Sequence, residues 1–317
     1  MANRTEGAFP SSTGLGDVFY RAWASGKSPR GAVQIVHGMA EHGERYEGFA
    51  AALNSAGYDV WAMDLPGHGR SAGDEALGYF GSELGYKKVL ADIHRLTGIM
   101  QGEYPGQLPI FLFGHSMGSF YARLYCERNS GELAGAVFCG TSGPNPAASS
   151  GVLVAKLIAA LRGERHRSQL LDNIAFGTYN KRFEGRTKFD WLNTDQAEVD
   201  KYLADPRCGF TFTVQGLLDL FSLLKSVSGK QWFASMPYQF PVLLVAGGDD
   251  PVGSYGKGVE LVAKRLREAG ANRVKCEIYP GMRHEILLEP GRQQVHEAVI
   301  EWLNNAAAAA AQPEAAK

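Results

Sequence analysis

Residues 111–118 read Phe-Leu-Phe-Gly-His-Ser-Met-Gly, an apolar run that leads into Gly-x-Ser-x-Gly and then into a helix-like segment over 119–129. A strand that turns sharply into a helix can hold a serine exposed at the top of a parallel sheet. Gly114 and Gly118 suit such a turn, because side chains at these positions would collide with neighbouring backbone. The stretch therefore predicts an α/β fold, and it makes Ser116 the candidate nucleophile.

Strand-like and helix-like segments alternate on both sides of this stretch. Runs rich in β-branched and aromatic residues recur at 32–36, 58–63, 110–113, 134–139, 242–246 and 274–279. Helix-like segments lie between most of them, at 46–56, 86–103, 119–129, 257–269 and 292–304. Such alternation predicts a mostly parallel sheet covered by helices on both faces. We also expect an antiparallel edge strand near residues 17–23.

The alternation stops in the middle of the chain. Residues 143–236 read as helices and loops without a convincing strand, so we expect an inserted helical cap there. The cap divides the core into residues 1–142 and 237–305. The last segment, 306–317, is an alanine-rich, low-complexity tail.

Two apolar segments lie inside this cap. Residues 151–161 are apolar nearly all round, and residues 210–227 place large apolar side chains at helical spacing. We expect both segments to pack onto the core. The alternative is that one of them lines an acyl pocket or touches a lipid surface, an idea that Arg162, Arg165 and Arg167 support because they follow the first segment directly.

The composition is that of a soluble globular enzyme. Hydrophobic residues make up 45% of the 317 residues, charged residues make up 21%, and the formal net charge is -1. A nearly neutral chain has no long-range field to attract a polyanion, so we expect no nucleic-acid partner. The four cysteines, Cys126, Cys139, Cys208 and Cys276, lack C-x-x-C spacing, and we expect all four to be packing residues.

The N-terminal segment bears on the location of the protein. Residues 1–14 contain no apolar h-region, and no stretch approaches the roughly 18 apolar residues that a membrane helix needs. Both observations disfavour export and membrane spanning. We therefore expect a cytoplasmic protein, with contact to a membrane limited to its periphery.

A histidine and two aspartates follow late strand-like runs. A serine hydroxyl is a weak nucleophile at neutral pH unless a base accepts its proton. His284 meets this need, since it lies in the loop between the run 274–279 and the last helix-like segment. An acid must hold the imidazole in the right tautomer, and both Asp249 and Asp250 follow the run 242–246. The chain order serine, aspartate, histidine is the one that this kind of fold uses.

Acyl transfer also needs donors for the oxyanion that develops on the substrate. Two preorganised backbone N–H groups are the usual solution. One is expected from Met117, the residue after the nucleophile, and the other from Met39, in the glycine-containing loop after the run 32–36.

Other polar residues invite a functional interpretation that we do not favour. His37, His42, His68 and His115 lack the spacing of a metal-binding motif, so we expect structural hydrogen bonds and no metal. The glycine-rich stretch 64–71 lacks the lysine and the length of a phosphate-binding loop, and it is typical of a structured turn. Glu41, Arg45 and Tyr46 are expected to form a network at a helix start.

Five stretches together resemble the monoacylglycerol lipase and lysophospholipase branch of the α/β-hydrolases, also known as serine aminopeptidase S33 or hydrolase-4 domains. They are HGMAEHGERY (37–46), DLPGHGRS (64–71), GHSMGS (114–119), GGDDPVG (247–253) and YPGMRHEILLE (279–289). Five agreeing motifs in the same order are far more specific than any single one.

The resemblance implies an α/β-hydrolase fold and hydrolysis of a carboxylic ester through an acyl-enzyme, without a cofactor. The cap at 143–236 matches the variable lid of the family but shares no motif with it, so the acyl and alcohol preferences do not transfer. Because the cap is rich in apolar residues, we expect a monoacylglycerol, a lysophospholipid or a similar lipid-like ester as substrate. The sequence indicates no oligomeric state and no substrate-binding residue.

The resemblance also assigns roles to residues. Ser116, Asp250 and His284 match the catalytic triad of the family, and Met39 and Met117 match its oxyanion donors. Asp250 is preferred over Asp249 because it stands three residues after a glycine and directly before a proline, as in the family's G-x-x-D pattern. The carboxylate of Asp249 is expected to cap a turn or to face water.

Three other functions share the same fold. An aminopeptidase would use the same triad but would need an acidic pocket for a free amino terminus. A cofactor-free perhydrolase is a further alternative, and halide-dependent peroxide chemistry would reveal it. A non-enzymatic binding protein is the least favoured alternative, because such proteins need not retain all three members of a triad.

Overall fold

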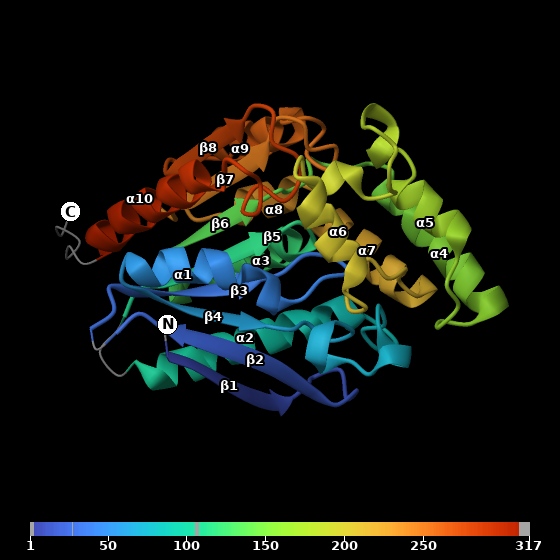
Figure 1. The fold of residues 1–317 in the computed structure, drawn as a ribbon, viewed down its shortest axis with the longest axis horizontal. Coiled ribbons are helices and arrows are strands. Elements are labelled where there is room, and N and C mark those ends of the chain that lie inside the picture. The colour runs from blue at the N-terminus through green and yellow to red at the C-terminus, as the bar shows by residue number, and fades with distance from the viewer. Residues whose placement is uncertain (1–2, 27, 105–107, 311–317) are drawn as a thin grey trace.

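One eight-stranded sheet organises the chain in the computed structural model, which describes residues 3–26, 28–104 and 108–310 (Figure 1). The strand order across the sheet is β1-β2-β4-β3-β5-β6-β7-β8. The strands are β1 (Asn3–Pro10), β2 (Asp17–Ala24), β3 (Gly31–Val36), β4 (Tyr58–Met63), β5 (Ile110–His115), β6 (Gly135–Cys139), β7 (Val242–Gly247) and β8 (Val274–Tyr279). This is an α/β-hydrolase fold, as expected.

The strands from β3 to β8 run parallel, and each lies within about two residues of its predicted range. β2 pairs antiparallel with β4, which confirms the antiparallel direction expected for residues 17–23. β2 is not the edge strand, however, because β1 pairs with it along eight residues. The first five residues of β1 are four charged or polar residues and a glycine, so the segment carries little of the apolar alternation that marks a strand.

Helices cover both faces of the sheet, and strand residues alternate between two cores. Val33 and Ile35 of β3 face the core formed by α1 (Glu47–Ser55) and α10 (Arg292–Ala310), whereas Ala32 and Val36 face the opposite core. That second core is built on α2 (Gly85–Glu103), α3 (Met117–Asn129), α8 (Lys230–Ser235) and α9 (Lys257–Glu268). Apolar side chains on both faces explain why the strands have continuous apolar sequences.

The cap lies beyond the carboxyl ends of the parallel strands (Figure 1). Its helices are α4 (Ala148–Arg162), α5 (Gln169–Phe176), α6 (Gln196–Ala204) and α7 (Val214–Ser226). Residues 140–241, all of which the structure describes, contain no strand. One expectation was wrong: Phe210 precedes the helix, because Thr213 caps α7 by accepting a hydrogen bond from the N–H of Gly216 (3.1 Å).

The last helix extends beyond its predicted end. α10 continues to Ala310, six residues past residue 304, since the alanines after it are strong helix formers. Residues 311–317 of the predicted tail lie outside the described residues. Among the described residues, no helix combines the length and apolar character needed to span a bilayer.

Candidate active site

Ser116 stands on the tight turn between β5 and α3. Its backbone has φ 52° and ψ −119°, a conformation that costs energy for any residue other than glycine. A side chain on Gly114 would collide with the carbonyl of Gly118, and one on Gly118 would collide with the carbonyl of Val36. The turn is therefore possible only with glycines on both sides of the serine, as the sequence motif indicated.

His284 and Asp250 meet on neighbouring loops of the sheet's carboxyl edge. The Nδ1 atom of His284 lies 2.9 Å from Oδ2 of Asp250, and both side chains are buried. The other carboxylate oxygen of Asp250 accepts a hydrogen bond from the N–H of Val252 (2.8 Å). Asp249 is exposed, so of the two candidate aspartates only Asp250 contacts the imidazole. This contact leaves Nε2 of His284 as the ring nitrogen available for proton exchange.

Ser116 and His284 line one cavity of about 510 Å³, together with Met39 and Met117. Met117 is the first residue of α3, so its N–H has no partner within the helix. The N–H of Gly38 is already occupied, since it donates to Oε1 of Glu41 (2.6 Å), and Met39 is the next residue of that loop. All five predicted site residues therefore lie at one end of the sheet, with Asp250 behind the histidine.

Glu41 is the centre of a buried network beneath this cavity. Its Oε1 atom accepts hydrogen bonds from the N–H of Gly38 (2.6 Å) and the hydroxyl of Tyr46 (2.8 Å), and it lies 3.1 Å from Nδ1 of His115. Its Oε2 atom pairs with Arg45 (2.9 Å). The expected network of Glu41, Arg45 and Tyr46 is thus confirmed, and it includes the loop of Gly38 and Met39.

Electrostatics within this network favour charged forms. Burial alone would raise the pKa of Glu41, but the hydrogen bond from His115 and the charge of Arg45 outweigh it and hold that pKa well below its usual value. Burial would likewise lower the pKa of His115, yet the hydrogen bond and the charge of Glu41 raise it. His115 in turn reaches the carbonyl of His284 with Nε2 (3.3 Å). The charge pair of Glu41 and His115 thus connects the turn of Ser116, the loop of Gly38 and Met39, and the loop of His284.

Contacts from the cap fix the position of the loop that carries His284. The ring of Trp191 packs on the imidazole with centroids 5.0 Å apart, and the N–H of Glu285 donates to the carbonyl of Leu192 (2.8 Å). Arg283 also donates to the carbonyls of Asp190 and Asn193. These contacts between the cap and the loop of His284 were not predicted from the sequence. The dense aromatic and polar run at 189–194 was the signal that could have indicated them.

The cavity wall facing Ser116 is mostly supplied by the cap. Apolar lining residues come from four cap segments, and they include Phe176, Phe189, Trp191, Phe210, Leu220, Phe221 and Leu224. A smaller set of polar residues, Asn145, Asn173 and Asn180 among them, shares the lining. α7 therefore packs onto the core, as expected, and also contributes to the pocket wall. A volume of this size suits a small-molecule ligand.

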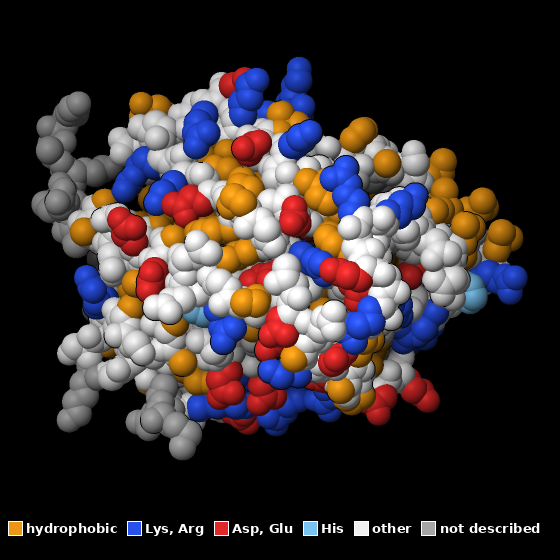
Figure 2. Space-filling view, turned by 45° about the horizontal axis from the view of Figure 1, so that its top comes forward, with side chains coloured by type: hydrophobic (Ala, Val, Ile, Leu, Met, Phe, Trp, Pro, Cys, Tyr) orange, Lys and Arg blue, Asp and Glu red, His pale blue; other side chains and the backbone are white. Residues whose placement is uncertain are grey.

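The outer face of the cap carries exposed apolar side chains. Leu153, Leu157 and Leu161 stand four residues apart on α4, and Leu170 and Ile174 stand four apart on α5, all between 56% and 74% exposed. Figure 2 shows hydrophobic side chains gathered at the end of the molecule that the cap forms. The expectation that residues 151–161 only pack onto the core was therefore wrong. Ile174 also lines the cavity, so this apolar patch is continuous with the cavity mouth.

The remaining polar motifs have structural roles. His37 accepts a hydrogen bond from the N–H of Leu65 (2.9 Å), and burial lowers the pKa of His68 to about 3, so its ring stays neutral. The stretch 64–71 is a structured turn, as expected, because Asp64 pairs with Arg21 (2.7 Å) inside the protein. The four cysteines, all within the described ranges, are free thiols.

Comparisons with known proteins agree with this fold. A family model described as Hydrolase_4, serine aminopeptidase, S33, matches residues 27–291. The monoacylglycerol lipase of Mycolicibacterium smegmatis is 29% identical over 303 residues, which cover 95% of this chain and 98% of that protein. A thermostable carboxyl esterase from Bacillus coagulans, solved in complex with glycerol, is 35% identical, with a TM-score of 0.90 and coverage of 97% and 99%. A lipase solved in an open form is 29% identical, with a TM-score of 0.88 and coverage of 96% and 99%.

Proposed function

The chain belongs to the serine aminopeptidase S33 (Hydrolase_4) family and is an esterase- and lipase-like α/β-hydrolase, and from this premise we propose that it hydrolyses lipid-like carboxylic esters through an acyl-enzyme. Ser116 is the nucleophile, His284 the general base, and Asp250 the carboxylate that orients the imidazole. The observation that carries this proposal is the cavity at the strand ends, which joins Ser116 and His284 to an apolar wall supplied by the cap.

The proposed reaction begins when Nε2 of His284 takes the proton of the Ser116 hydroxyl as its oxygen attacks the ester carbonyl. The N–H groups of Met39 and Met117 stabilise the oxyanion, and Asp250 stabilises the imidazolium. The imidazolium then gives its proton to the leaving alcohol, and an ester forms between Ser116 and the acyl group. A water molecule then attacks the acyl-enzyme while His284 takes its proton, and the fatty acid is released from Ser116.

The proposed substrates are monoacylglycerols, lysophospholipids or similar esters with one apolar chain. The aromatic and leucine side chains of the cap suit an acyl chain, while the asparagines in the same lining suit a polar alcohol group. Two relatives point the same way, since one is named a monoacylglycerol lipase and another was solved with glycerol.

We further propose that the apolar patch of α4 and α5 rests on a lipid surface that delivers the substrate. An exposed patch of large apolar side chains marks an interaction surface, and Ile174 links it to the cavity mouth. Lys156 and Arg162 are exposed on the same helix and suit anionic head groups. Arg165 and Arg167 do not belong to this set, because Arg165 stacks on Tyr79 and Arg167 donates to the carbonyl of Leu77 (2.8 Å).

The test combines active-site labelling with a substrate series. Wild type and Ser116→Ala are treated with a fluorophosphonate probe, and hydrolysis is measured on p-nitrophenyl esters of increasing chain length, a monoacylglycerol and a lysophospholipid. We expect wild type alone to be labelled, with the rate of Ser116→Ala lower by on the order of 10⁶. Asp250→Asn should lower the rate by about 10⁴-fold, and its matched control Asp249→Asn should leave it unchanged.

The same assay separates the alternative functions. Faster turnover of aminoacyl p-nitroanilides than of any ester would make the protein a peptidase, and halide-dependent peroxide chemistry would make it a perhydrolase. If the folded wild type neither labels nor hydrolyses any of these substrates, the enzyme proposal is wrong and a binding function replaces it.

A further inference from the structure

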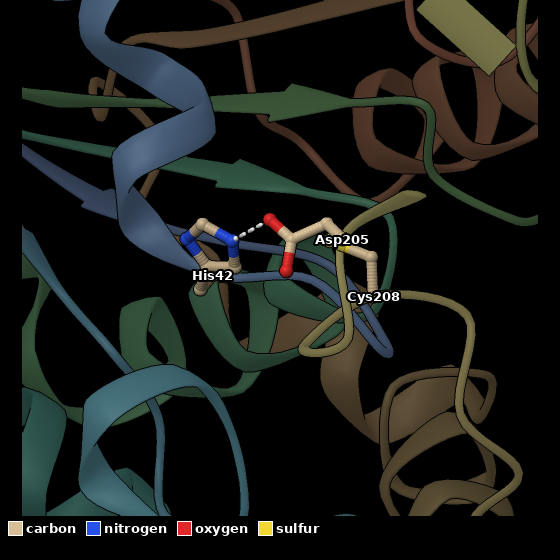
Figure 3. A group of neighbouring side chains, drawn as sticks. All are labelled: His42, Asp205 and Cys208. Atoms are coloured by element: carbon tan, nitrogen blue, oxygen red, sulfur yellow. Dashed lines mark hydrogen bonds and ion pairs between the residues drawn. The ribbon is translucent and has the colours of Figure 1, made fainter. Parts of the chain in front are cut away.

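Three side chains with metal-binding atoms meet where the cap touches the core, outside the proposed catalytic residues. His42 lies in the loop after β3, and Asp205 and Cys208 lie on the segment after α6 (Figure 3). Nε2 of His42 lies 2.9 Å from Oδ2 of Asp205, and one ligand atom from each of the three residues lies within 4.8 Å of the others.

The donor set matches a particular class of ion. An imidazole nitrogen, a carboxylate oxygen and a thiol sulfur together favour a transition-metal ion of borderline softness over Ca²⁺ or Mg²⁺, which prefer oxygen. Zinc binds all three donor types at about 2.0–2.3 Å, so tetrahedral coordination places the donor atoms about 3.3–3.6 Å apart. To reach that spacing, His42 and Asp205 have to separate by roughly half an ångström, and the sulfur of Cys208, which lies within 4.8 Å of both, has to approach them by at most about 1.5 Å.

The surroundings support the binding of a cation. His42 and Cys208 are buried, whereas the side chain of Asp205 is 33% exposed and offers an entry path from solvent. The second oxygen of Asp205 accepts a hydrogen bond from the N–H of Arg207 (2.8 Å), which orients the carboxylate. The guanidinium of Arg45, whose charge acts on Asp205 and Cys208, is paired with both Glu41 and Glu285, so its charge is already balanced.

We propose that His42, Asp205 and Cys208 form a site for a divalent transition-metal ion, with zinc as the best match and a water molecule as the fourth ligand. The ion would join two segments that already touch, since the N–H of Gly209 donates to the carbonyl of Ala40 (2.9 Å). Met39 is the residue before Ala40. The site is therefore a clip between the cap and the oxyanion loop, and it takes no part in the proposed reaction.

This inference changes two expectations drawn from the sequence. No metal was expected, because the histidines lack metal-binding spacing, and Cys208 was expected only to pack. The ligands of this site come from segments 163 residues apart, so no local motif encodes them. Only the contact between the cap and the core brings them together.

The test measures metal binding directly. Wild type is freed of metal with a chelator and titrated with Zn²⁺ by calorimetry at about pH 7.5, because metal binding releases ligand protons and is weaker at lower pH. Co²⁺ is then used as a spectroscopic probe, because a cobalt–thiolate bond gives a charge-transfer absorption. We expect one equivalent of Zn²⁺ to bind, a higher Tm with Zn²⁺, and the thiolate absorption with Co²⁺.

Two variants and one control decide the assignment. Cys208→Ser should abolish the cobalt–thiolate absorption and weaken Zn²⁺ binding by at least about tenfold. Asp205→Asn retains an oxygen that accepts the hydrogen bond of His42 but loses the charge, so it should keep the metal-free Tm of wild type and also bind Zn²⁺ more weakly. Cys276→Ser removes a thiol outside the cluster and should bind like wild type.

The proposal is overturned if metal-free wild type binds no Zn²⁺. It is also overturned if Cys208→Ser and Asp205→Asn bind Zn²⁺ as wild type does, because the ion then lies elsewhere, for example at His284. If Cys208→Ser does not fold, the affinity of Asp205→Asn for Zn²⁺ decides the assignment by itself. Hydrolytic activity is not needed for any of these readouts, so the result is independent of the proposed function.

Discussion

Glu41 holds the loop of Gly38 and Met39, which supplies one of the proposed oxyanion donors. One carboxylate oxygen holds the N–H of Gly38, the hydroxyl of Tyr46 and the ring of His115, while the other holds Arg45. Glu41 lines the cavity, but the contacts of its carboxylate are with Gly38, Tyr46, His115 and Arg45, so we expect it to act through the loop that carries Met39. It is a positioning residue in the proposed mechanism.

We expect Glu41→Gln to lower kcat by about 10- to 100-fold and to leave KM nearly unchanged. An amide keeps only one of the two acceptor oxygens, so either Arg45 or the pair of Gly38 and Tyr46 meets an NH2 group where it needs an acceptor. The loop then shifts, and the oxyanion is held less well. Steady-state kinetics on a short ester and the rate of fluorophosphonate labelling check this. Glu44→Gln, an exposed change three residues away, is the control, and equal kinetics in both variants would contradict the positioning role.

At the scale of elements, the buried acid Asp219 lies where α7 packs against the start of α2. Asp219 accepts the N–H of Tyr86 (3.2 Å) and a hydrogen bond from Gln215 (3.2 Å), but burial outweighs both and raises its pKa to about 6. The folded protein therefore holds this proton more tightly than the unfolded chain. The ionised form destabilises the fold at neutral pH.

We expect Asp219→Asn to stabilise the protein by about 2 kcal/mol at pH 8, because the penalty of ionising the buried acid disappears. The destabilisation by Asp219 grows as pH rises from about 4 to about 6 and is absent below that window, where both states are protonated. Urea unfolding at pH 8 and at pH 4 measures this. The gain should vanish at pH 4, and exposed Asp74→Asn should show no gain at either pH.

The outer faces of α4 and α5 supply a second prediction at this scale. Replacing Leu153, Leu157 and Leu161 together by Gln removes the apolar stripe of α4, so binding to phospholipid vesicles should fall by about tenfold or more. Vesicle flotation measures binding, and hydrolysis of a soluble short ester should not change, because these residues do not line the cavity.

The matched control replaces three exposed leucines outside the patch, Leu84, Leu203 and Leu261, by Gln. We expect it to bind vesicles like wild type. If both triple variants lose binding equally, general surface hydrophobicity accounts for vesicle binding, and the assignment to the cap is wrong.

At the scale of the whole molecule, one buried ion pair ties together segments from three places in the chain. Arg21 on β2 pairs with Asp64 after β4, and both side chains are 1% exposed. Asp64 also accepts the N–H groups of Gly43 and Arg70 (both 2.9 Å). Burial opposes the charge of Asp64, but Arg21 outweighs it and lowers the pKa to about 2.

We expect Arg21→Met to lower the free energy of unfolding by about 3–5 kcal/mol at pH 7, because it leaves the buried carboxylate without its cation. The double variant Arg21→Met/Asp64→Asn should be destabilised by less than the sum of the two single changes. Denaturant unfolding of the four proteins gives this cycle. Additive effects would mean that the pair contributes no coupling.

The sequence by itself determined the local parts of this protein. The apolar runs specify the parallel strands, because strands buried on both faces need apolar side chains on both. Gly114 and Gly118 specify the tight turn at Ser116, because backbone would collide with any larger residue at either position. Strong periodic or steric constraints act within a few residues, and for that reason the strands, most helices and the order of Ser116, Asp250 and His284 were predictable.

Only the tertiary structure decided that β1 covers the sheet edge and that part of the cap is exposed and apolar. It also decided that Trp191 packs on His284 and that Cys208 lies beside His42. Each of these depends on how residues far apart in the chain are packed. A composition or a local pattern carries no information on that packing, because the same apolar helix can face a core, a pocket or a lipid surface.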